Sequence, residues 1–254
     1  MTPEFGSPRT AIVTGGARRI GEAIVRALAA DGWTVLIHCH HSGDAARALA
    51  GELGNAYVVE ADMAAPDVAE AIIAALAGLP PPGLLVNNAS RFAYDDLDGF
   101  TVAAWDEHIA VNLRGPALLT QAFAQAVPEG AGALIVNLLD AKLAQPNPDF
   151  FTYTISKMGL AGLTELSARA LAPRRIRVCA IAPSITLVSG QQTRDNFAEV
   201  HAMNALERGV TVDEIVAALR FIVATPTLTG HTIRIDGGQR FLSLPRDVQF
   251  MVDR

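Results

Sequence analysis

A tyrosine and a lysine spaced four residues apart form the most reactive pair in the chain. They occur in Tyr153-Thr-Ile-Ser-Lys157, and Lys157 is one of only two lysines among 20 basic residues. On a helix, residues i and i+4 share one face, so the ammonium would lie beside the phenol. A phenol with its ordinary pKa of about 10 is a poor acid or base at neutral pH, and a neighbouring cation lowers that pKa. We therefore expect an acid–base pair in which Lys157 lowers the pKa of Tyr153; an exposed helical pair is the alternative.

A glycine-rich turn near the start of the chain predicts a phosphate site. The segment Thr14-Gly15-Gly16-Ala17-Arg18-Arg19-Ile20-Gly21 joins an apolar strand pattern to an apolar helical pattern. Glycines let the backbone turn sharply and approach a pyrophosphate, which then lies at the helix N-terminus, where free N–H groups point. An ordinary tight turn is the alternative, but the position in the first strand–helix unit favours dinucleotide binding.

The end of the second strand pattern indicates which dinucleotide this would be. It consists of His38-Cys39-His40-His41-Ser42, with no acidic residue before Asp44. NAD needs a carboxylate here for its ribose 2′-hydroxyl, whereas NADP needs donors for a 2′-phosphate. Imidazole and hydroxyl donors beside Arg18 and Arg19 favour NADP(H). A polar surface loop is the alternative. A metal site is not expected, because no further ligands with suitable spacing follow.

Alternating strand and helix patterns would position these groups. Strands are expected at 10–14, 33–38, 56–60, 83–87, 133–137, 176–181 and 231–235, and helices at 20–30, 45–53, 66–77, 102–126, 151–172 and 212–224. Continuous apolar strands alternating with helices are typical of a parallel sheet that is covered on both faces. We predict an α/β fold: one Rossmann-type, doubly wound, parallel seven-stranded sheet. The irregular segment 184–208 follows a strand end, where ligands bind in such sheets, and is interpreted as a substrate flap.

The composition narrows the class of protein. The 254 residues are 50% apolar and carry a net charge of −6, which argues against disordered, fibrous and nucleic-acid-binding proteins. No apolar run approaches the roughly 20 residues of a membrane span, and no secretion signal is recognisable. Two distant cysteines define neither a disulfide framework nor a zinc site, so the cytoplasm is the expected compartment. We expect residues 1–8 to form a flexible leader, of the kind that cloning also leaves, and 9–254 to form a single catalytic domain.

The motifs, in this order, resemble those of the short-chain dehydrogenase/reductase family over essentially the whole chain. The turn is similar to the family's Thr-Gly-x-x-x-Gly-x-Gly, with Arg19 in place of the middle glycine. Asn87-Asn88-Ala89-Ser90 is similar to its Asn-Asn-Ala-Gly, and the Tyr153–Lys157 pair and Asp236-Gly237-Gly238 also match. The usual Pro-Gly after the sixth strand is Pro183-Ser184 here.

This resemblance implies roles for several residues. Asp62 and Met63 would hold the adenine, the Asn88 loop would line the nicotinamide ribose, and Lys157 would also bind that ribose. Asn112, a polar residue inside an apolar helical pattern, would belong to a proton relay; a residue that bends the helix is the alternative. The family also implies a dimer or tetramer assembled through the long helices 102–126 and 151–172.

Four features are similar to one subgroup, the pteridine reductases. They are Arg19, the Ser90-x-Phe92 pair, the histidine-rich strand end and Asp140, which stands 13 residues before Tyr153 where the family has a serine. In this subgroup His41 would be an arginine. The resemblance implies a pterin-like substrate with a cyclic C=N bond. Phe92 would stack the pterin against the nicotinamide, and Asp140 would help Tyr153 deliver a proton to the ring nitrogen.

The expected site can be stated residue by residue. The catalytic residues would be Asn112, Asp140, Tyr153 and Lys157. The cofactor would be bound by Gly15, Arg18, Arg19, Ile20, His38, His40, His41, Ser42, Asp62, Met63, Asn88, Ala89, Ser90, Tyr153, Lys157, Pro183 and Ser184. The small-molecule substrate would be bound by Arg19, Ser90, Phe92, Asp140 and Tyr153.

Two other functions stay open at this point. One is an NADPH-dependent carbonyl or 3-oxoacyl reductase, in which Asp140 orients the carbonyl as a neutral acid. The other is a catalytically idle NADPH-binding sensor, suggested by the missing serine. The intact pair Tyr153 and Lys157 argues against an idle protein.

Overall fold

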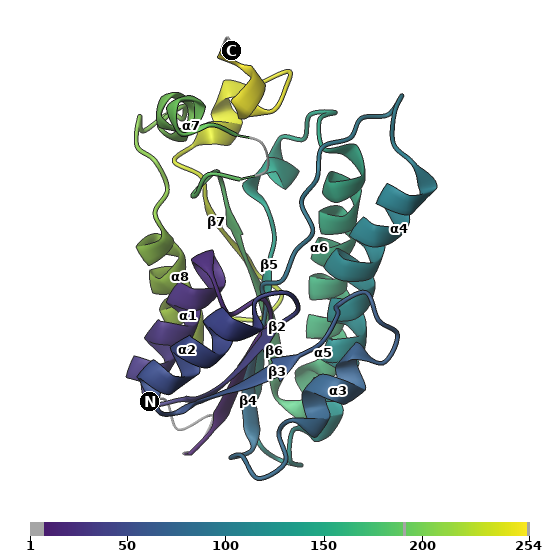
Figure 1. The fold of residues 1–254 in the computed structure, drawn as a ribbon, viewed down its shortest axis with the longest axis vertical. Coiled ribbons are helices and arrows are strands. Elements are labelled where there is room, and N and C mark those ends of the chain that lie inside the picture. Colours follow the sequence, from purple (N-terminus) through teal and green to yellow (C-terminus); the bar gives the residue numbers. More distant parts are fainter. Residues whose placement is uncertain (1–7, 190–191, 253–254) are drawn as a thin grey trace.

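Seven parallel strands form one sheet through the middle of the molecule (Figure 1). The structure is a computed structural model and describes residues 8–189 and 192–252; the expected leader, except Pro8, lies outside this range. The strand order is β3-β2-β1-β4-β5-β6-β7, which is the predicted doubly wound Rossmann-type topology. The strands are β1 (Thr10–Val13), β2 (Thr34–Cys39), β3 (Ala56–Glu60), β4 (Pro82–Asn87), β5 (Ala133–Leu138), β6 (Ile176–Pro183) and β7 (Thr232–Ile235).

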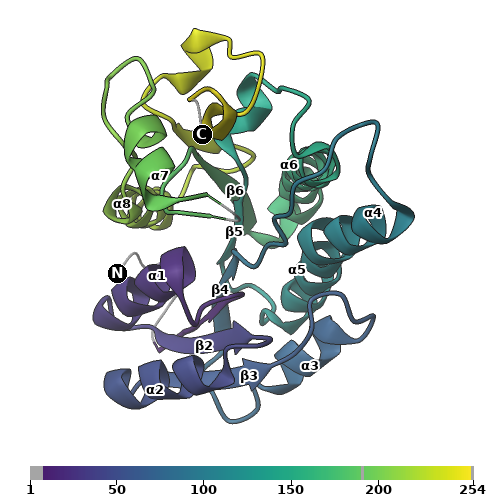
Figure 2. The ribbon, with the colours of Figure 1, turned by 45° about the horizontal axis from the view of Figure 1, so that its top comes forward.

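Helices cover both faces of the sheet, which explains why its central strands are apolar throughout. In β1, Ala11 and Val13 belong to the core under α1 (Arg19–Ala30), α2 (Gly43–Leu53) and α8 (Val212–Ala224). Ile12, between them, points to the opposite core, under α3 (Val68–Ala74), α5 (Gly115–Ala126) and α6 (Phe151–Leu171). The two helical layers are visible on either side of the sheet in Figure 2. Side chains alternate between faces along a strand, so a strand with two buried faces needs a continuous apolar run.

Three helical segments differ from the prediction. The expected helix 102–126 is α4 (Val102–Ile109) and α5, joined by the π-helical segment η1 (Ala110–Arg114). A π turn interrupts the regular hydrogen-bond ladder, and hydrophobic periodicity does not reveal it. Helix α3 is shorter than the predicted helix 66–77. After Ala74 the N–H groups of Leu76 and Ala77 donate to carbonyls only three residues back, which is tighter than an α-helix, and Gly78 follows with a φ of 82°. The irregular segment 184–208 contains α7 (Arg194–His201), although its residues 190 and 191 lie outside the described range.

The carboxyl ends of all seven strands point to the same edge of the sheet, as parallel pairing requires. The flap segment and the C-terminal residues lie over this edge (Figures 1 and 2). In the described part of the chain, none of the helices combines the length and the apolar character that crossing a membrane requires. The described residues also contain no group of three or more His, Cys, Asp or Glu side chains placed to hold a metal ion.

Candidate active site

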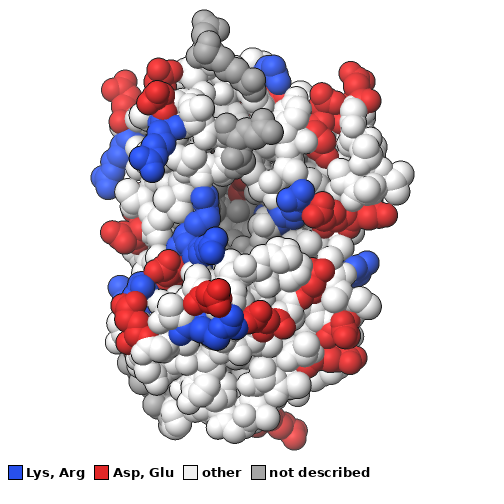
Figure 3. All heavy atoms as spheres, viewed as in Figure 1, with Lys and Arg blue, Asp and Glu red and all other residues white. Residues whose placement is uncertain are grey.

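A cavity of about 780 Å³ lies along the carboxyl ends of the strands. On the face shown in Figure 3, Lys and Arg side chains flank the central hollow. The cavity is lined from Gly15 and Arg18 at one end to Lys142 and Asp247 at the other. Every predicted site residue except Asn112 lines it. The order of the strands in the sheet therefore brings together loops that are far apart in the sequence.

The glycine-rich turn leaves no space for side chains where it approaches the β4 loop. Gly15 has a φ of 61°, and a Cβ there would stand 3.0 Å from the Cα of Ala89. A Cβ on Gly21 would lie 2.1 Å from the Gly15 carbonyl oxygen. Arg19 also has a positive φ, 58°, which is in the left-handed region that favours glycine, the residue that the family resemblance implies at this position. The departure in sequence thus leaves the turn geometry intact and adds a guanidinium to the cavity.

His38 holds the glycine-rich turn through a hydrogen bond to its backbone. The Gly15 N–H donates to Nδ1 of His38 at 3.2 Å, and Nε2 of His38 lies 3.0 Å from the Ala61 carbonyl oxygen, to which it donates. Burial lowers the pKa of His38 to about 4, so the ring stays neutral. Both ring nitrogens are engaged within the protein, which leaves no N–H for a cofactor phosphate. His38 therefore differs from the expected phosphate donor: it belongs to the site by holding the turn.

The residues that follow β2 line a second, open pocket of about 290 Å³. Its lining includes Arg18, His40, His41 and Ser42, together with Arg47, which the sequence analysis did not single out. The His40 and His41 rings stack with their centroids 3.6 Å apart, and Arg47 pairs with Asp44 at 2.7 Å and with Glu60. His40 Nδ1 is 3.7 Å from Asp62 Oδ1. Helix periodicity places Arg47 one turn after Asp44, and this spacing is the only signal that could have identified it.

The loop after β4 is fixed to the glycine-rich turn by hydrogen bonds. The Thr14 hydroxyl accepts from the backbone N–H groups of Asn88 and Ala89 at 2.9 and 3.0 Å. The Asn88 amide in turn donates to the Thr14 and Gly15 carbonyls at 2.8 and 3.1 Å. Thr14 is part of the motif but was not predicted as a site residue, and its hydroxyl is what couples the two loops.

Asn112 lies in η1 and clamps the Ser90–Arg91 loop to helix α6. Its Oδ1 accepts from the Arg91 backbone N–H at 2.7 Å and from the Ser90 hydroxyl at 3.2 Å. Its Nδ2 donates to the Arg91 carbonyl at 2.9 Å and to the Ser156 hydroxyl at 3.0 Å. Its amide is thus saturated by protein groups and does not line the cavity. The geometry agrees with the alternative interpretation, an irregularity in the helix at Asn112.

The centre of the cavity holds Tyr153 and Asp140 in direct contact. The Tyr153 hydroxyl donates to Asp140 Oδ2 at 2.9 Å, and Asp140 Oδ1 accepts from the Lys142 N–H at 2.8 Å. Tyr153 is only 7% exposed. Burial, together with the neighbouring carboxylate of Asp140, raises the pKa of Tyr153 well above its ordinary value. The phenol is therefore held protonated and aimed at a carboxylate.

Lys157 lies under the tyrosine ring but does not act on it as predicted. Its Nζ is 5.8 Å from the centre of the Tyr153 ring and donates to the Leu138 carbonyl at 2.8 Å. Burial lowers the pKa of Lys157 to about 8, although Asp140 opposes this shift. The pKa of Tyr153 is thus raised, whereas the spacing to Lys157 predicted that it would be lowered. The reason is that desolvation and Asp140 dominate the environment of the phenol.

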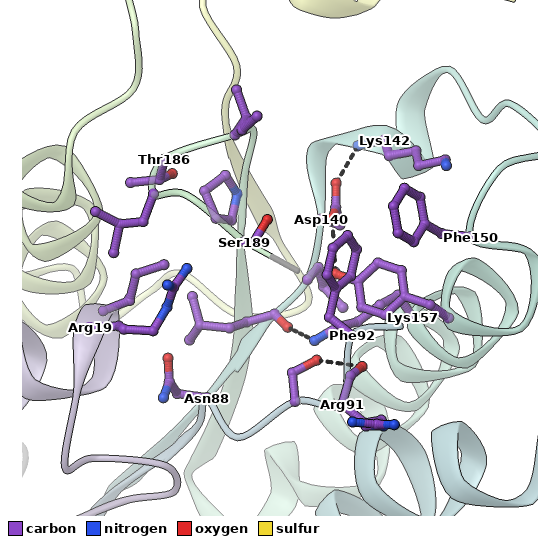
Figure 4. A pocket seen from close by; sticks show the side chains of 18 of the residues that line it. Arg19, Asn88, Arg91, Phe92, Asp140, Lys142, Phe150, Lys157, Thr186 and Ser189 are labelled. Carbon is purple, nitrogen blue, oxygen red and sulfur yellow. Dashed lines mark hydrogen bonds between the residues drawn. The ribbon is translucent and has the colours of Figure 1, made fainter. Parts of the chain in front are cut away.

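An aromatic wall closes one side of the cavity next to the tyrosine. The Phe92 ring stacks on Phe150 with centroids 4.4 Å apart and meets the Tyr153 ring edge-on at 4.8 Å. Figure 4 shows Phe92 and Phe150 beside Asp140. Phe150, with a φ of 54° just before α6, was not predicted, because nothing in the local sequence separates it from core aromatics.

The flap segment meets the cofactor end of the cavity. The Arg19 guanidinium donates to the Val188 carbonyl at 2.7 Å, across 169 residues of sequence. Ser184, after Pro183 at the end of β6, is held by its N–H to the Ile235 carbonyl at 2.9 Å. Thr186 and Ser189 line the cavity opposite Asp140 (Figure 4). The flap thus covers the site from the side of β6.

Comparison with known proteins gives the same fold and motif order. The family model described as short chain dehydrogenase matches residues 9–199. A FolM alternative dihydrofolate reductase 1 from Brucella canis, crystallised with NADP, is 40% identical; the match covers 94% of this chain and 97% of that one, with a TM-score of 0.90. Pteridine reductase 1 from Leishmania tarentolae is 30% identical over 94% of this chain and 98% of its own. A 3-oxoacyl-[acyl-carrier-protein] reductase from Synechocystis is 31% identical over 91% and 96%.

The family match spans the glycine-rich turn, the Asn88 loop, Asp140 and the Tyr153–Lys157 pair, which are the groups that line the cavity. The seven-stranded topology and the relatives over nine-tenths of the chain agree with it. This protein is an oxidoreductase of the short-chain dehydrogenase family.

Proposed function

We propose that this protein is an NADPH-dependent reductase of a C=N bond in a pterin-like substrate, a dihydropteridine or a dihydrofolate. The observation that carries the proposal is the 2.9 Å hydrogen bond from the Tyr153 hydroxyl to Asp140, next to the Phe92 ring, which Tyr153 meets edge-on at 4.8 Å. The relatives from Brucella and Leishmania, which are a dihydrofolate reductase and a pteridine reductase by name, support the same substrate class.

The residues present fit a dinucleotide phosphate. The turn at Gly15 has no room for a side chain, and no side chain caps the N-terminus of α1, so its first N–H groups can receive a phosphate. Arg18, His40, His41 and Ser42 surround a pocket whose acidic members, Asp44 and Glu60, both pair with Arg47. Donors in this setting suit a 2′-phosphate better than a 2′-hydroxyl. When bound, NADPH supplies the hydride.

The proton would come from Tyr153 and Asp140. Because its pKa is raised, the Tyr153 phenol stays protonated, as reduction of C=N to CH–NH requires of the group that gives up the proton. As the imine nitrogen gains electrons, it becomes the stronger acceptor and takes the proton of the Tyr153 hydroxyl. Asp140 would then pass a solvent proton back to the phenolate through the same hydrogen bond. A serine in place of Asp140 could orient a carbonyl but could not carry a proton in this way.

Phe92 would hold the flat ring of the substrate. One face of Phe92 is covered by Phe150, so its position is fixed by stacking. Ser90, whose hydroxyl donates to Asn112, and Arg19, which reaches the flap, would contact the ring on the cofactor side. We propose that Asn112 supports this loop and that Lys157 binds the nicotinamide ribose.

A substrate panel tests the proposal. Purified protein would be assayed with NADPH and with dihydrobiopterin, dihydromonapterin, dihydrofolate and aliphatic and 3-oxoacyl ketones. We expect turnover of at least one dihydropterin or dihydrofolate and a loss of it in Asp140→Ser, with NADPH affinity unchanged. Failure to reduce any pterin or folate would refute the proposal.

A second candidate is a carbonyl or 3-oxoacyl reductase, supported by the 31% identical relative from Synechocystis. Reduction of the ketones alone, retained or increased in Asp140→Ser, would favour it. NADPH binding without turnover of any compound would instead indicate a sensor.

We also propose a cytoplasmic dimer or tetramer that uses the outer faces of α4 and α6. The family resemblance implies this assembly, and it would cover Val102 on α4 and Leu166 on α6, which are 76% and 68% exposed. Gel filtration with light scattering would show a mass of at least two chains; a monomer would contradict the assembly.

A further inference from the structure

The C-terminal segment, residues 236–252, folds back over the catalytic loop of its own chain. Arg246 pairs with the buried Asp149 through two hydrogen bonds of 2.6 and 3.2 Å, and the Asp247 N–H donates to the same carboxylate at 2.7 Å. The Phe250 ring packs against Phe150, with centroids 6.1 Å apart. Leu244, Asp247, Val248 and Gln249 line the cavity. This segment is therefore a wall of the site.

Lys142 connects this wall to the catalytic loop. It follows Asp140 by two residues, and its side chain is only 9% exposed. Its ammonium donates to the Asp149 carbonyl, lies 5.3 Å from the centre of the Phe150 ring and stands 3.5 Å from Asp247 Oδ2. Figure 4 shows Lys142 on the Phe150 side of Asp140, across the site from Arg19 and Asn88. Burial lowers the pKa of Lys142, as expected for a cation that is nearly enclosed.

Asp247 retains capacity to accept hydrogen bonds from a ligand. Its Oδ1 accepts from the Gln249 N–H at 3.3 Å, and the 3.5 Å separation of Oδ2 from Lys142 is long for a charge-assisted hydrogen bond. The side chain is 21% exposed and lines the cavity. Asn147, also in the lining, has a buried Oδ1 for which the described residues provide no partner. This end of the cavity is thus rich in acceptors, which suits hydroxyl or amino groups.

The end of the cavity that is lined by Lys142, Asn147 and Asp247 remains for a substituent of the substrate. The dinucleotide turn occupies the opposite end, near Gly15 and Arg18. A flat ring next to Phe92, with its reacting nitrogen at Tyr153, lies between the two ends. Groups carried by that ring on the side away from the cofactor would then face Lys142 and Asp247.

We propose that Asp247 is a specificity-determining residue that accepts a hydrogen bond from a neutral, donor-bearing substituent of the substrate and disfavours an anionic one. Lys142 holds the carboxylate in place and limits its repulsion of anions. This inference rests on the proposed pterin reductase activity and names the property of the substituent that the site selects. It also gives a role to Lys142, the lysine that follows Asp140 by two residues.

Two dihydropterins test the inference, one with a neutral hydroxyl donor at C6 and one with an anionic group that has no donor there. The probes are 6-hydroxymethyl-7,8-dihydropterin and 7,8-dihydropterin-6-carboxylate, each assayed with NADPH. We expect the wild type to favour the hydroxymethyl compound about tenfold in kcat/KM, through KM. In Asp247→Asn the side-chain oxygen can still accept from the Gln249 N–H, but the negative charge is gone. This variant should bring the ratio close to one. Lys142→Met removes a cation that lowers the pKa of Asp247, so the ratio should rise above the wild-type value at a pH high enough to keep this carboxyl ionised.

The matched control is Asp213→Asn, which removes an exposed carboxylate at the start of α8 and should leave the ratio unchanged. Taking the ratio of two substrates in one variant cancels a general loss of active protein, and NADPH affinity reports folding. An unchanged ratio in Asp247→Asn, or a wild type that prefers the carboxylate, would overturn the inference while leaving the pterin activity intact. If the wild type reduces neither compound nor any other pterin, the proposed function fails, and the inference fails with it.

Discussion

The two ends of the cavity are built in different ways. At the cofactor end, β1, β2, β3 and β4 end side by side. Backbone hydrogen bonds connect the strand ends there, such as those from the Thr14 N–H to the Val86 carbonyl at 3.0 Å and from the Gly16 N–H to the His38 carbonyl at 2.9 Å. At the substrate end, Lys142 meets Asp247 across 105 residues of sequence, and Asp149 meets Arg246 across 97. The first end is an obligatory consequence of the sheet, whereas the second depends on a few side-chain contacts between distant segments.

This difference teaches where variation is tolerated. At the cofactor end, Arg19 replaces a glycine yet keeps a positive φ, because the turn around it is over-determined by Gly15, Gly21 and the loop after β4. At the substrate end, the flap and the C-terminal segment contact each other through the Asn196 amide, which donates to the Gln249 carbonyl at 3.0 Å. Side-chain contacts of this kind can change without disturbing the sheet, so we expect substrate choice to be decided there.

The largest effect is expected where the two ends meet, at Tyr153. Tyr153→Phe removes the proton donor but keeps the buried ring, so kcat should fall by roughly 10³-fold while the Kd for NADPH stays within twofold. Stopped-flow measurement of NADPH oxidation with a dihydropterin, together with fluorescence titration of NADPH, checks both values. A variant with wild-type turnover would show that Asp140 or water donates the proton instead.

The next effect concerns His38 and is a test of stability at the cofactor end. The folded protein keeps His38 neutral down to a pKa of about 4, whereas the unfolded chain takes up a proton below about 6.5. Stability should therefore fall as the pH falls through this window, and this one group contributes about 3 kcal/mol of the loss. In His38→Asn, whose Oδ1 can still accept from the Gly15 N–H, the difference in unfolding free energy between pH 7 and pH 4 should be smaller by that amount.

Urea unfolding at the two pH values measures this difference. The matched control is His231→Asn, an exposed histidine that should leave the pH dependence as in the wild type. If His38→Asn and the wild type lose the same free energy on acidification, the turn does not depend on a neutral imidazole.

A smaller effect is expected from loosening the substrate end alone. Arg246→Ala breaks the pair with Asp149, whose buried carboxylate keeps only its bond from the Asp247 N–H. We expect KM for the dihydropterin to rise about tenfold, since the C-terminal wall is less well held, with the Kd for NADPH unchanged. A parallel loss of NADPH affinity would show that the cofactor end depends on the contacts of the substrate end, and would contradict their independence.

The smallest effect is expected at the cofactor pocket. His41→Arg places a permanently charged, bidentate donor next to Arg18 and Ser42, as the resemblance to pteridine reductases implies for this position. The Kd for NADPH should fall about threefold, with the KM for the dihydropterin unchanged. Isothermal titration with NADPH and NADH checks that the gain is confined to the phosphorylated cofactor; an equal gain for NADH would argue against a 2′-phosphate at this pocket.

Local patterns were enough to predict the sheet, its helices and the cofactor end. Apolar runs define the strands, and the residues that follow each strand must meet at one edge because the strands are parallel. Gly15, Asn88, Asp140, Tyr153 and Lys157 were therefore found from spacing and resemblance, and the structure brings them into one cavity. The π turn at Asn112 was not predicted, since a single inserted residue barely changes hydrophobic periodicity.

What the amino-acid sequence determined by itself was the order of strands and helices and the side chains that end each strand, because these depend on neighbours in the chain. The tertiary structure alone decided the electrostatics. Tyr153 has a raised rather than a lowered pKa because burial and Asp140 outweigh Lys157, and desolvation cannot be read from spacing. It alone also gave Lys142 its partners, since a contact across 105 residues is encoded only in how the whole chain packs.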